Sequence, residues 1–273
     1  MRCLVALLLL AAGFARAVAA QGVIVAPHAI FLDHRTRSAS ITLYNPGADP
    51  VEVSISTFFA YPVTDSVGHF MLFTPDSIGS ATPSATDWIE AFPRRMTIAP
   101  LQRQTIRLLA RPPQGLVDGE YWSRIMITAQ GGALPVSGAD SSDIEIGLSL
   151  EVRTIIPLIY RKGQLQTGIS VSGLRTDVEG DSLRVRVRLE RQGGAAFLGT
   201  ARGTLVNDRG ATVATFQQPV AIYYDAEPVF ALPRAPAGQY TLHLEVSTER
   251  SDIATDQLLR APVVRDSFTV TLP

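Results

Sequence analysis

Residues 119–127 read GEYWSRIMI, and residues 238–246 read GQYTLHLEV. Each stretch opens with a Gly-x-Tyr turn and continues as a run of strand-forming residues, so the same local signature occurs once in each half of the chain. Immunoglobulin-like sandwiches place a tyrosine at the start of a late strand, where its hydroxyl bonds to nearby backbone. We therefore predict a structural role for Tyr121 and Tyr240. The alternative is a chance Gly-x-Tyr at each turn.

The sequence around these stretches has the pattern of strands and turns. From Gln21 onward, short runs of alternating apolar residues are separated by Gly, Pro, Asn and Asp, and no long run has a helical period. A break at residues 160–164 separates two sets of expected strands. We predict an all-β fold of two immunoglobulin-like antiparallel β-sandwich domains, at residues 21–162 and 163–273.

One connection in the first half, residues 61–87, is longer than a hairpin turn requires and is rich in Ser, Thr, Gly, Pro and Asp. It holds a short apolar patch at residues 70–73. We expect an added hairpin that lies over the first domain, and a disordered decoration is the alternative.

The start of the chain has the features of a secretion signal. A basic residue, Arg2, precedes an apolar run at residues 3–12, and small residues spaced A-x-A follow. We predict that residues 1–20 are a cleaved signal peptide and that the mature protein is periplasmic. No later stretch approaches the roughly 20 apolar residues of a spanning helix, so we expect no transmembrane segment in the mature chain.

Composition and motifs argue against several functional classes. The 273-residue chain has a formal net charge of −1, and loss of Arg2 and Arg16 makes it −3 (22 basic against 25 acidic residues), which gives no basic excess for nucleic acid. The one cysteine, Cys3, lies in the leader. No metal-binding histidine spacing, nucleophile elbow or phosphate-binding glycine loop is present. We expect a protein that is not an enzyme and has neither cofactor nor metal, although a triad assembled from distant strands is not visible in a sequence.

Several stretches of the first half match one family together. They are residues 23–31 (VIVAPHAIF), 39–46 (ASITLYNP), 92–100 (FPRRMTIAP), 104–108 (QTIRL) and 121–127, with the run that ends at Arg161. Over residues 23–162 the chain thus resembles the PapD-like periplasmic chaperones of pilus assembly. The resemblance implies a second sandwich at an angle to the first. It also implies a secreted, fimbrial-type subunit as client, bound by β-strand donation, and an outer-membrane usher as a further partner.

The resemblance places a client-binding strand before the domain boundary, at residues 144–152 (IEIGLSLEV). Its apolar members are Ile144, Ile146, Leu148, Leu150 and Val152. Side chains alternate along a strand, so we expect these five to project from one face. An ordinary half-buried core strand has the same alternation and is the alternative.

The positions that would hold the client's terminal carboxylate depart from the family pattern. The family uses an arginine in the first strand and a lysine in the last strand of the first domain, and our alignment puts His28 and Pro157 there. A neutral imidazole and a proline cannot replace two fixed cations. Arg153 and Arg161 are the nearby cations that could substitute for them.

A second resemblance predicts a different class of function. Residues 45–53 (NPGADPVEV), with 98–100 and 118–121, are similar to the immunoglobulin-like domain of surface proteins that accompany WxL-type wall-binding proteins. The alternative function is therefore a non-catalytic surface or structural binding module of the cell envelope. Those proteins normally carry a C-terminal membrane anchor, whereas we expect this sequence to end in a strand.

Overall fold

The computed structural model describes residues 22–131, 134–135, 147–148 and 150–272. Within these ranges the chain forms strands and turns, with a single-turn 3-10 helix, η2, at Thr86–Trp88. No helix in this part of the chain is long and apolar enough to cross a membrane. The expected signal peptide lies outside the described residues.

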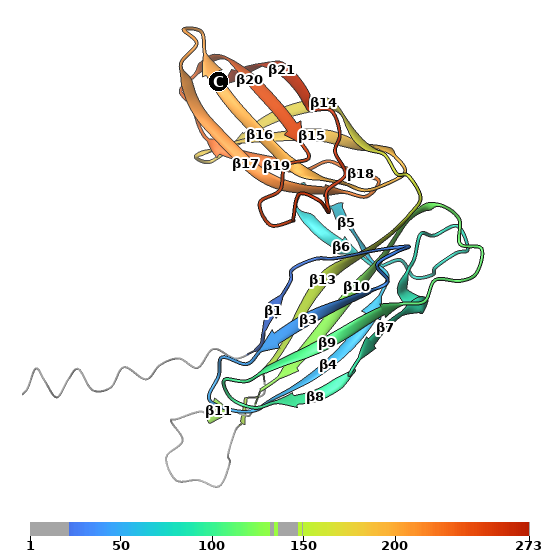
Figure 1. Ribbon diagram of the computed structural model, residues 1–273. Coiled ribbons are helices and arrows are strands. Elements are labelled where there is room, and N and C mark those ends of the chain that lie inside the picture. The colour runs from blue at the N-terminus through green and yellow to red at the C-terminus, as the bar shows by residue number, and fades with distance from the viewer. Residues whose placement is uncertain (1–21, 132–133, 136–146, 149, 273) are drawn as a thin grey trace, which may run out of the picture.

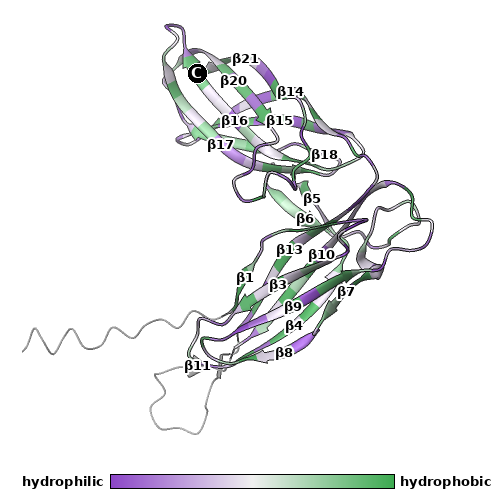
Figure 2. Ribbon diagram, viewed as in Figure 1, coloured by the Kyte–Doolittle hydropathy of each residue, from purple (hydrophilic) through white to green (hydrophobic). Residues whose placement is uncertain are grey.

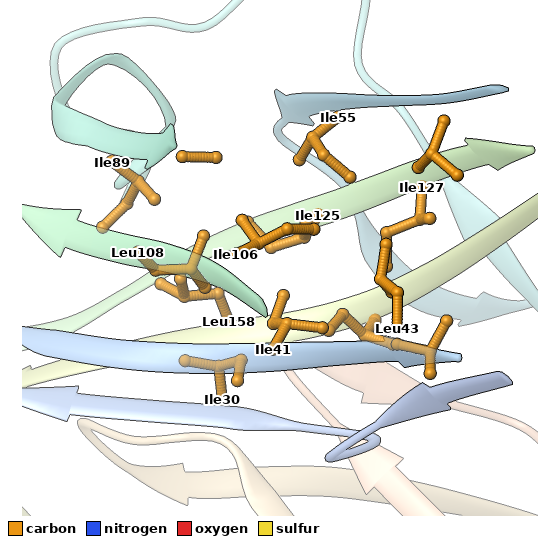
Figure 3. Packing of buried hydrophobic residues seen from close by; sticks show 14 of the residues in the cluster. Ile30, Ile41, Leu43, Ile55, Ile89, Ile106, Leu108, Ile125, Ile127 and Leu158 are labelled. Atoms are coloured by element: carbon orange, nitrogen blue, oxygen red, sulfur yellow. The ribbon is translucent and has the colours of Figure 1, made fainter. Parts of the chain in front are cut away.

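Two sheets face each other in the first sandwich (Figure 1). One has the strand order β1 (Ile24–Ala26), β3 (Ser38–Tyr44), β9 (Arg103–Ala110) and β7 (Ile89–Phe92). The other has the order β2 (Ile30–Asp33), β13 (Glu151–Lys162), β10 (Gly119–Gln130), β4 (Val51–Phe58) and β8 (Arg95–Ile98). Isoleucines and leucines from both sheets interlock between them, as Figure 3 shows for Ile41, Ile106, Ile125 and Leu158.

Alternation along the strands explains why they form these sheets. In β4, Val51, Val53 and Ile55 are buried, while the three polar residues between and after them are exposed. Figure 2 shows the same change between hydrophobic and hydrophilic residues along β9. A strand with this period of two is stable only when one of its faces is covered by a second layer, and the opposite sheet provides that layer.

The second sandwich is also built of two antiparallel sheets. One contains β14 (Thr167–Glu179), β15 (Ser182–Gly193), β18 (Asp225–Ala226) and β19 (Val229–Pro233), and the other has the order β17 (Thr212–Ile222), β16 (Phe197–Asn207), β20 (Gly238–Ser247) and β21 (Val264–Leu272). Their shared core includes Val185, Leu205, Phe230 and Leu242. The prediction of an all-β fold with two sandwiches is confirmed.

Each sandwich has a tyrosine hydroxyl bonded to the preceding turn. The Tyr121 hydroxyl donates to the carbonyl of Val117 at 3.0 Å, and the Tyr240 hydroxyl donates to the carbonyl of Pro236 at 2.8 Å. In both cases the acceptor lies four residues upstream. The repeated Gly-x-Tyr signature therefore has the same local geometry in both halves of the chain.

The long connection in the first half forms a hairpin of β5 (Tyr61–Thr64) and β6 (Phe70–Phe73). The expected position over the first domain is wrong, because the hairpin lies between the two sandwiches (Figure 1) and its tip bonds to the second. Val229 N donates to the carbonyl of Gly68 at 3.0 Å. Gly68 has φ +87°, and a Cβ there would lie 2.4 Å from Val229 Cγ2, so glycine is what permits this contact.

Candidate functional site

The last strand of the first sandwich, β13, has two different edges. On one side it pairs with β10 along its whole length. On the other side β2 pairs only with Leu158–Arg161, while β1 crosses to the opposite sheet and pairs with β3. Among the described residues, no strand therefore pairs with this edge over residues 151–157, which leaves backbone groups there that an added strand can bond to.

The two faces of β13 have different neighbours. Ile156, Leu158 and Tyr160 are buried in the first core. The alternate residues point away from that core, and Ile155 among them is 43% exposed. Farther along the same face, Ile159 is buried in a cluster that also contains residues of the second sandwich. The outer face of β13 thus begins in solvent and ends at the junction between the sandwiches.

The structure describes part of the predicted client-binding strand. Ile144 and Ile146 lie outside the described residues. Leu148 belongs to the short strand β12 (Gly147–Leu148), which pairs with β11 (Leu134–Pro135). Leu150 is 42% exposed and Val152 is half-buried beside Gly22.

The register changes between β12 and β13. Gln130 pairs with Glu151 in the β10–β13 ladder, and continuing that register would place Leu134 opposite Gly147, but Leu134 pairs with Leu148. The register of the β11–β12 pair is therefore offset by one residue from that of the β10–β13 ladder. The expectation that all five apolar residues share one face stays a prediction.

A cavity of about 500 Å³ lies beside the unpaired edge of β13, where the sandwiches meet. Ile155 and Pro157 line it from β13, Phe70 and Leu72 line it from the hairpin, and Ile253 lines it from the second sandwich. His28, the other position at which the chaperone pattern places a carboxylate anchor, also lines this cavity. His28 and Pro157, the two positions at which the sequence departs from the chaperone pattern, therefore line the same cavity.

The cations that the sequence suggested as substitutes have other partners. Arg153 Nε lies 2.5 Å from Glu151 Oε1 on the exposed outer surface. Arg161 Nε donates to Glu120 Oε2 at 2.8 Å, and its Nη1 donates to the carbonyl of Gln257 at 2.5 Å. Neither residue lines the cavity.

The carboxylate of Glu120 joins the two sandwiches. Its side chain is fully buried, and it accepts hydrogen bonds from Trp122 Nε1 and from Ala196 N, each at 2.8 Å, as well as from Arg161. A buried carboxylate needs such partners, because charge is costly to remove from water. Arg161 and Glu120 therefore hold the junction together.

Two cations that the sequence analysis missed do line the cavity, Arg124 and Arg250. Arg124 is 6% exposed; its Nε donates to the carbonyl of Ala60 at 2.9 Å, and its guanidinium lies 5.2 Å from the centre of the Tyr223 ring. Burial raises the pKa of the Tyr223 hydroxyl, so this group stays neutral beside the cation. An arginine inside the apolar run of β10 was the signal that could have identified Arg124.

Arg250 already has an acidic partner. It donates to both carboxylate oxygens of Asp252, at 2.7 and 2.5 Å, and these bonds lower the pKa of Asp252. The pair is therefore close to neutral overall. In the part of the chain that the structure describes, no group of three or more His, Cys, Asp or Glu side chains is arranged to hold a metal ion.

No protein-family model matches the chain, and no curated protein matches it. Solved structures do. The Pseudomonas aeruginosa CupB2 chaperone has 14% sequence identity and a TM-score of 0.42, with 91% of this chain and 100% of that chain covered.

Two further solved structures contain a chaperone with its subunit. For the Salmonella enterica SafA pilin in complex with the SafB chaperone, the identity is 16% and the TM-score 0.41, with 94% of this chain and 99% of that chain covered. For the CsuC–CsuE chaperone–tip subunit complex of Acinetobacter baumannii Csu pili, the identity is 12% and the TM-score 0.46, with 89% and 97% covered. The chain is thus similar to solved chaperones of pilus systems.

Proposed function

We propose that this protein is a periplasmic chaperone that binds a secreted, fimbrial-type subunit by β-strand addition along β13. The observation that carries the proposal is the edge of β13 over residues 151–157, which pairs with no described strand, whereas Leu158–Arg161 lie between two neighbouring strands. An extended client segment bonds to such an edge through its main chain. The periplasmic location rests on the expected signal peptide, and an outer-membrane usher is the expected further partner.

Side chains on this part of β13 give the added strand a register. Ile155 is the large apolar residue on the outer face, and Leu150 precedes the strand with a similar exposure. Apolar residues that stay in solvent beside an unpaired backbone edge are typical of an interaction surface. Burial of Ile155 against a client removes apolar area from water, at about 25 cal/mol per Å².

The adjoining cavity offers one net positive charge to the client. Arg250 and Asp252 neutralise each other, whereas the described contacts of Arg124 are a carbonyl oxygen and an aromatic ring. Arg124 is therefore our candidate for the role for which the sequence offered Arg153 and Arg161 as possible substitutes. A client carboxylate would accept charge-assisted hydrogen bonds from its guanidinium.

Neighbouring residues of β13 provide a matched test of client binding. Ile155→Thr removes apolar surface on the exposed face, and Ile156→Thr does so at a side chain that is 3% exposed. Both changes keep a β-branched residue. We expect Ile155→Thr to leave the melting temperature within about 2 °C of wild type and to reduce recovery of a co-expressed secreted subunit several-fold. Ile156→Thr should destabilise the first sandwich by about 1–3 kcal/mol.

Pull-down from periplasmic extracts and thermal unfolding are measured on the same preparations. If Ile155→Thr retains its subunit as well as wild type does, the β13 edge is not the binding strand. If the wild-type protein recovers no secreted subunit, the chaperone function is wrong and the surface binding module is favoured instead.

A further inference from the structure

The β5–β6 hairpin belongs to the first sandwich in sequence but is fixed to the second by its contacts. Its Thr64 Oγ1 accepts a hydrogen bond from Glu227 N at 2.8 Å, and Arg184 and Arg186 donate to carbonyls at its tip at 3.1 Å. Phe70 packs against the core of the second sandwich. The hairpin is thus held at both ends, by its covalent connections and by its tip.

This placement makes the hairpin one wall of the cavity. Pro62 pairs with Leu72 across the hairpin, and both line the cavity. Met71, 50% exposed, lines it as well. The β13 residues Ile155 and Pro157 line the same cavity, so a client segment on the β13 edge would place a side chain among apolar groups from both elements.

Phe73 lies on the same strand but in different surroundings. It is 42% exposed, does not line the cavity, and contacts Tyr61 with ring centroids 5.5 Å apart. Met71 and Phe73 are therefore two half-exposed apolar residues of β6, of which only one borders the cavity. The chain itself supplies a matched control.

We propose that the hairpin determines which client side chain the cavity accepts: a bulky apolar residue with a carboxylate next to it. The apolar class follows from the walls formed by Leu72, Met71 and Ile155, and the carboxylate follows from Arg124, the cation at the cavity without an acidic partner among its described contacts. This inference rests on the proposed function. It adds a selection step that the β13 edge alone cannot provide, because main-chain bonding does not distinguish side chains.

The test uses synthetic extended peptides of alternating Val and Thr as probes. One end position carries Ala, Leu or Phe and is followed by Asp or Asn, and each peptide is made with a free and with an amidated C-terminus. Binding to the full mature protein is measured by fluorescence anisotropy. We expect the Leu or Phe peptides with a carboxylate to bind about tenfold more tightly than the Ala or the uncharged peptides. The amidated series distinguishes a side-chain from a terminal carboxylate.

Met71→Glu places a negative charge at the cavity, and Phe73→Glu places the same charge away from it. We expect Met71→Glu to abolish the preference for the peptides with a carboxylate and Phe73→Glu to retain it, with both variants melting within about 3 °C of wild type. Equal binding by Met71→Glu and wild type, or an equal loss in both variants, would overturn the inference.

The two proposals fail in distinguishable ways. If wild type binds the peptides without preference and Ile155→Thr weakens all of them, strand addition stands and selection by the hairpin is wrong. If wild type binds neither a secreted subunit nor any peptide, both proposals are wrong.

Discussion

The two halves of β13 differ in their surroundings although they form one continuous strand. Residues 151–157 have β10 on one side and no described strand on the other, whereas Leu158–Arg161 lie between β10 and β2. Each half also carries an ion pair. Glu151 and Arg153 are 34% and 62% exposed, while Glu120 and Arg161 are 0% and 15% exposed.

The closed half of β13, Leu158–Arg161, connects the two sandwiches, whereas the open half, residues 151–157, presents a surface to solvent. In the closed half, a buried carboxylate joins β13, β10 and the second sandwich, so its loss leaves donors from three segments without an acceptor. In the open half, water can replace the partner of either charge. Burial therefore decides which of two similar ion pairs is structural.

The largest expected effect comes from breaking the buried pair. Glu120→Ala leaves Arg161 Nε, Trp122 Nε1 and Ala196 N without their acceptor, and we expect a loss of about 3–5 kcal/mol in the free energy of unfolding. Urea unfolding followed by the fluorescence of the two tryptophans, Trp88 and Trp122, measures it.

Glu151→Ala is the matched control, and we expect no measurable loss of stability, because this pair is exposed to water. Equal losses in the two variants would mean that the junction is not closed in solution as the structure has it.

A smaller effect, of opposite sign, is expected at Tyr160 in the closed half. Its hydroxyl is the one buried side-chain polar atom of the described residues without a hydrogen-bond partner, and burial raises its pKa. Removal of an unsatisfied buried hydroxyl relieves a desolvation penalty, so Tyr160→Phe should be neutral or stabilising by up to about 1 kcal/mol.

Tyr240→Phe removes a hydroxyl that does have an acceptor, the carbonyl of Pro236. We expect it to cost about 1 kcal/mol. Calorimetry of the two variants compares them, and a clear destabilisation by Tyr160→Phe would indicate that its hydroxyl has a partner, such as ordered water.

The smallest effect concerns pH and the open half. A hydrogen bond from Gln130, and to a smaller extent one from Arg153, lowers the pKa of Glu151. The ionised carboxylate therefore contributes to stability above the ordinary carboxyl pKa, and this contribution is lost as the pH falls through the lowered pKa. The pair is exposed, so we expect Glu151→Gln to melt within about 1 °C of wild type at pH 7. The difference in melting temperature between wild type and Glu151→Gln should be smaller at pH 3 than at pH 7. A difference that widens at pH 3 would contradict the assignment.

Local pattern was sufficient for much of the fold. The alternation in β4 identifies its buried face, and the Gly-x-Tyr turns at Tyr121 and Tyr240 identify corresponding strands in two sandwiches. These features depend on residues within about ten positions of one another, where side-chain period and turn chemistry act directly. The cavity-lining cations could not be assigned in this way. Arg153 and Arg161 were close in sequence to the expected site, but their guanidiniums are directed to Glu151 and Glu120.

The strand character of β13 and the presence of two sandwiches follow from the amino-acid sequence, because alternation and turn residues are local properties. Three features depend instead on the tertiary structure: residues 151–157 pair with no described strand at one edge, the β5–β6 hairpin binds the second sandwich, and Arg124 lines the cavity. The physical reason is that alternation specifies which face of a strand is buried but not which strand lies at its edge. The partners at an edge depend on the route of distant segments, here the crossing of the chain from β1 in one sheet to β2 in the other.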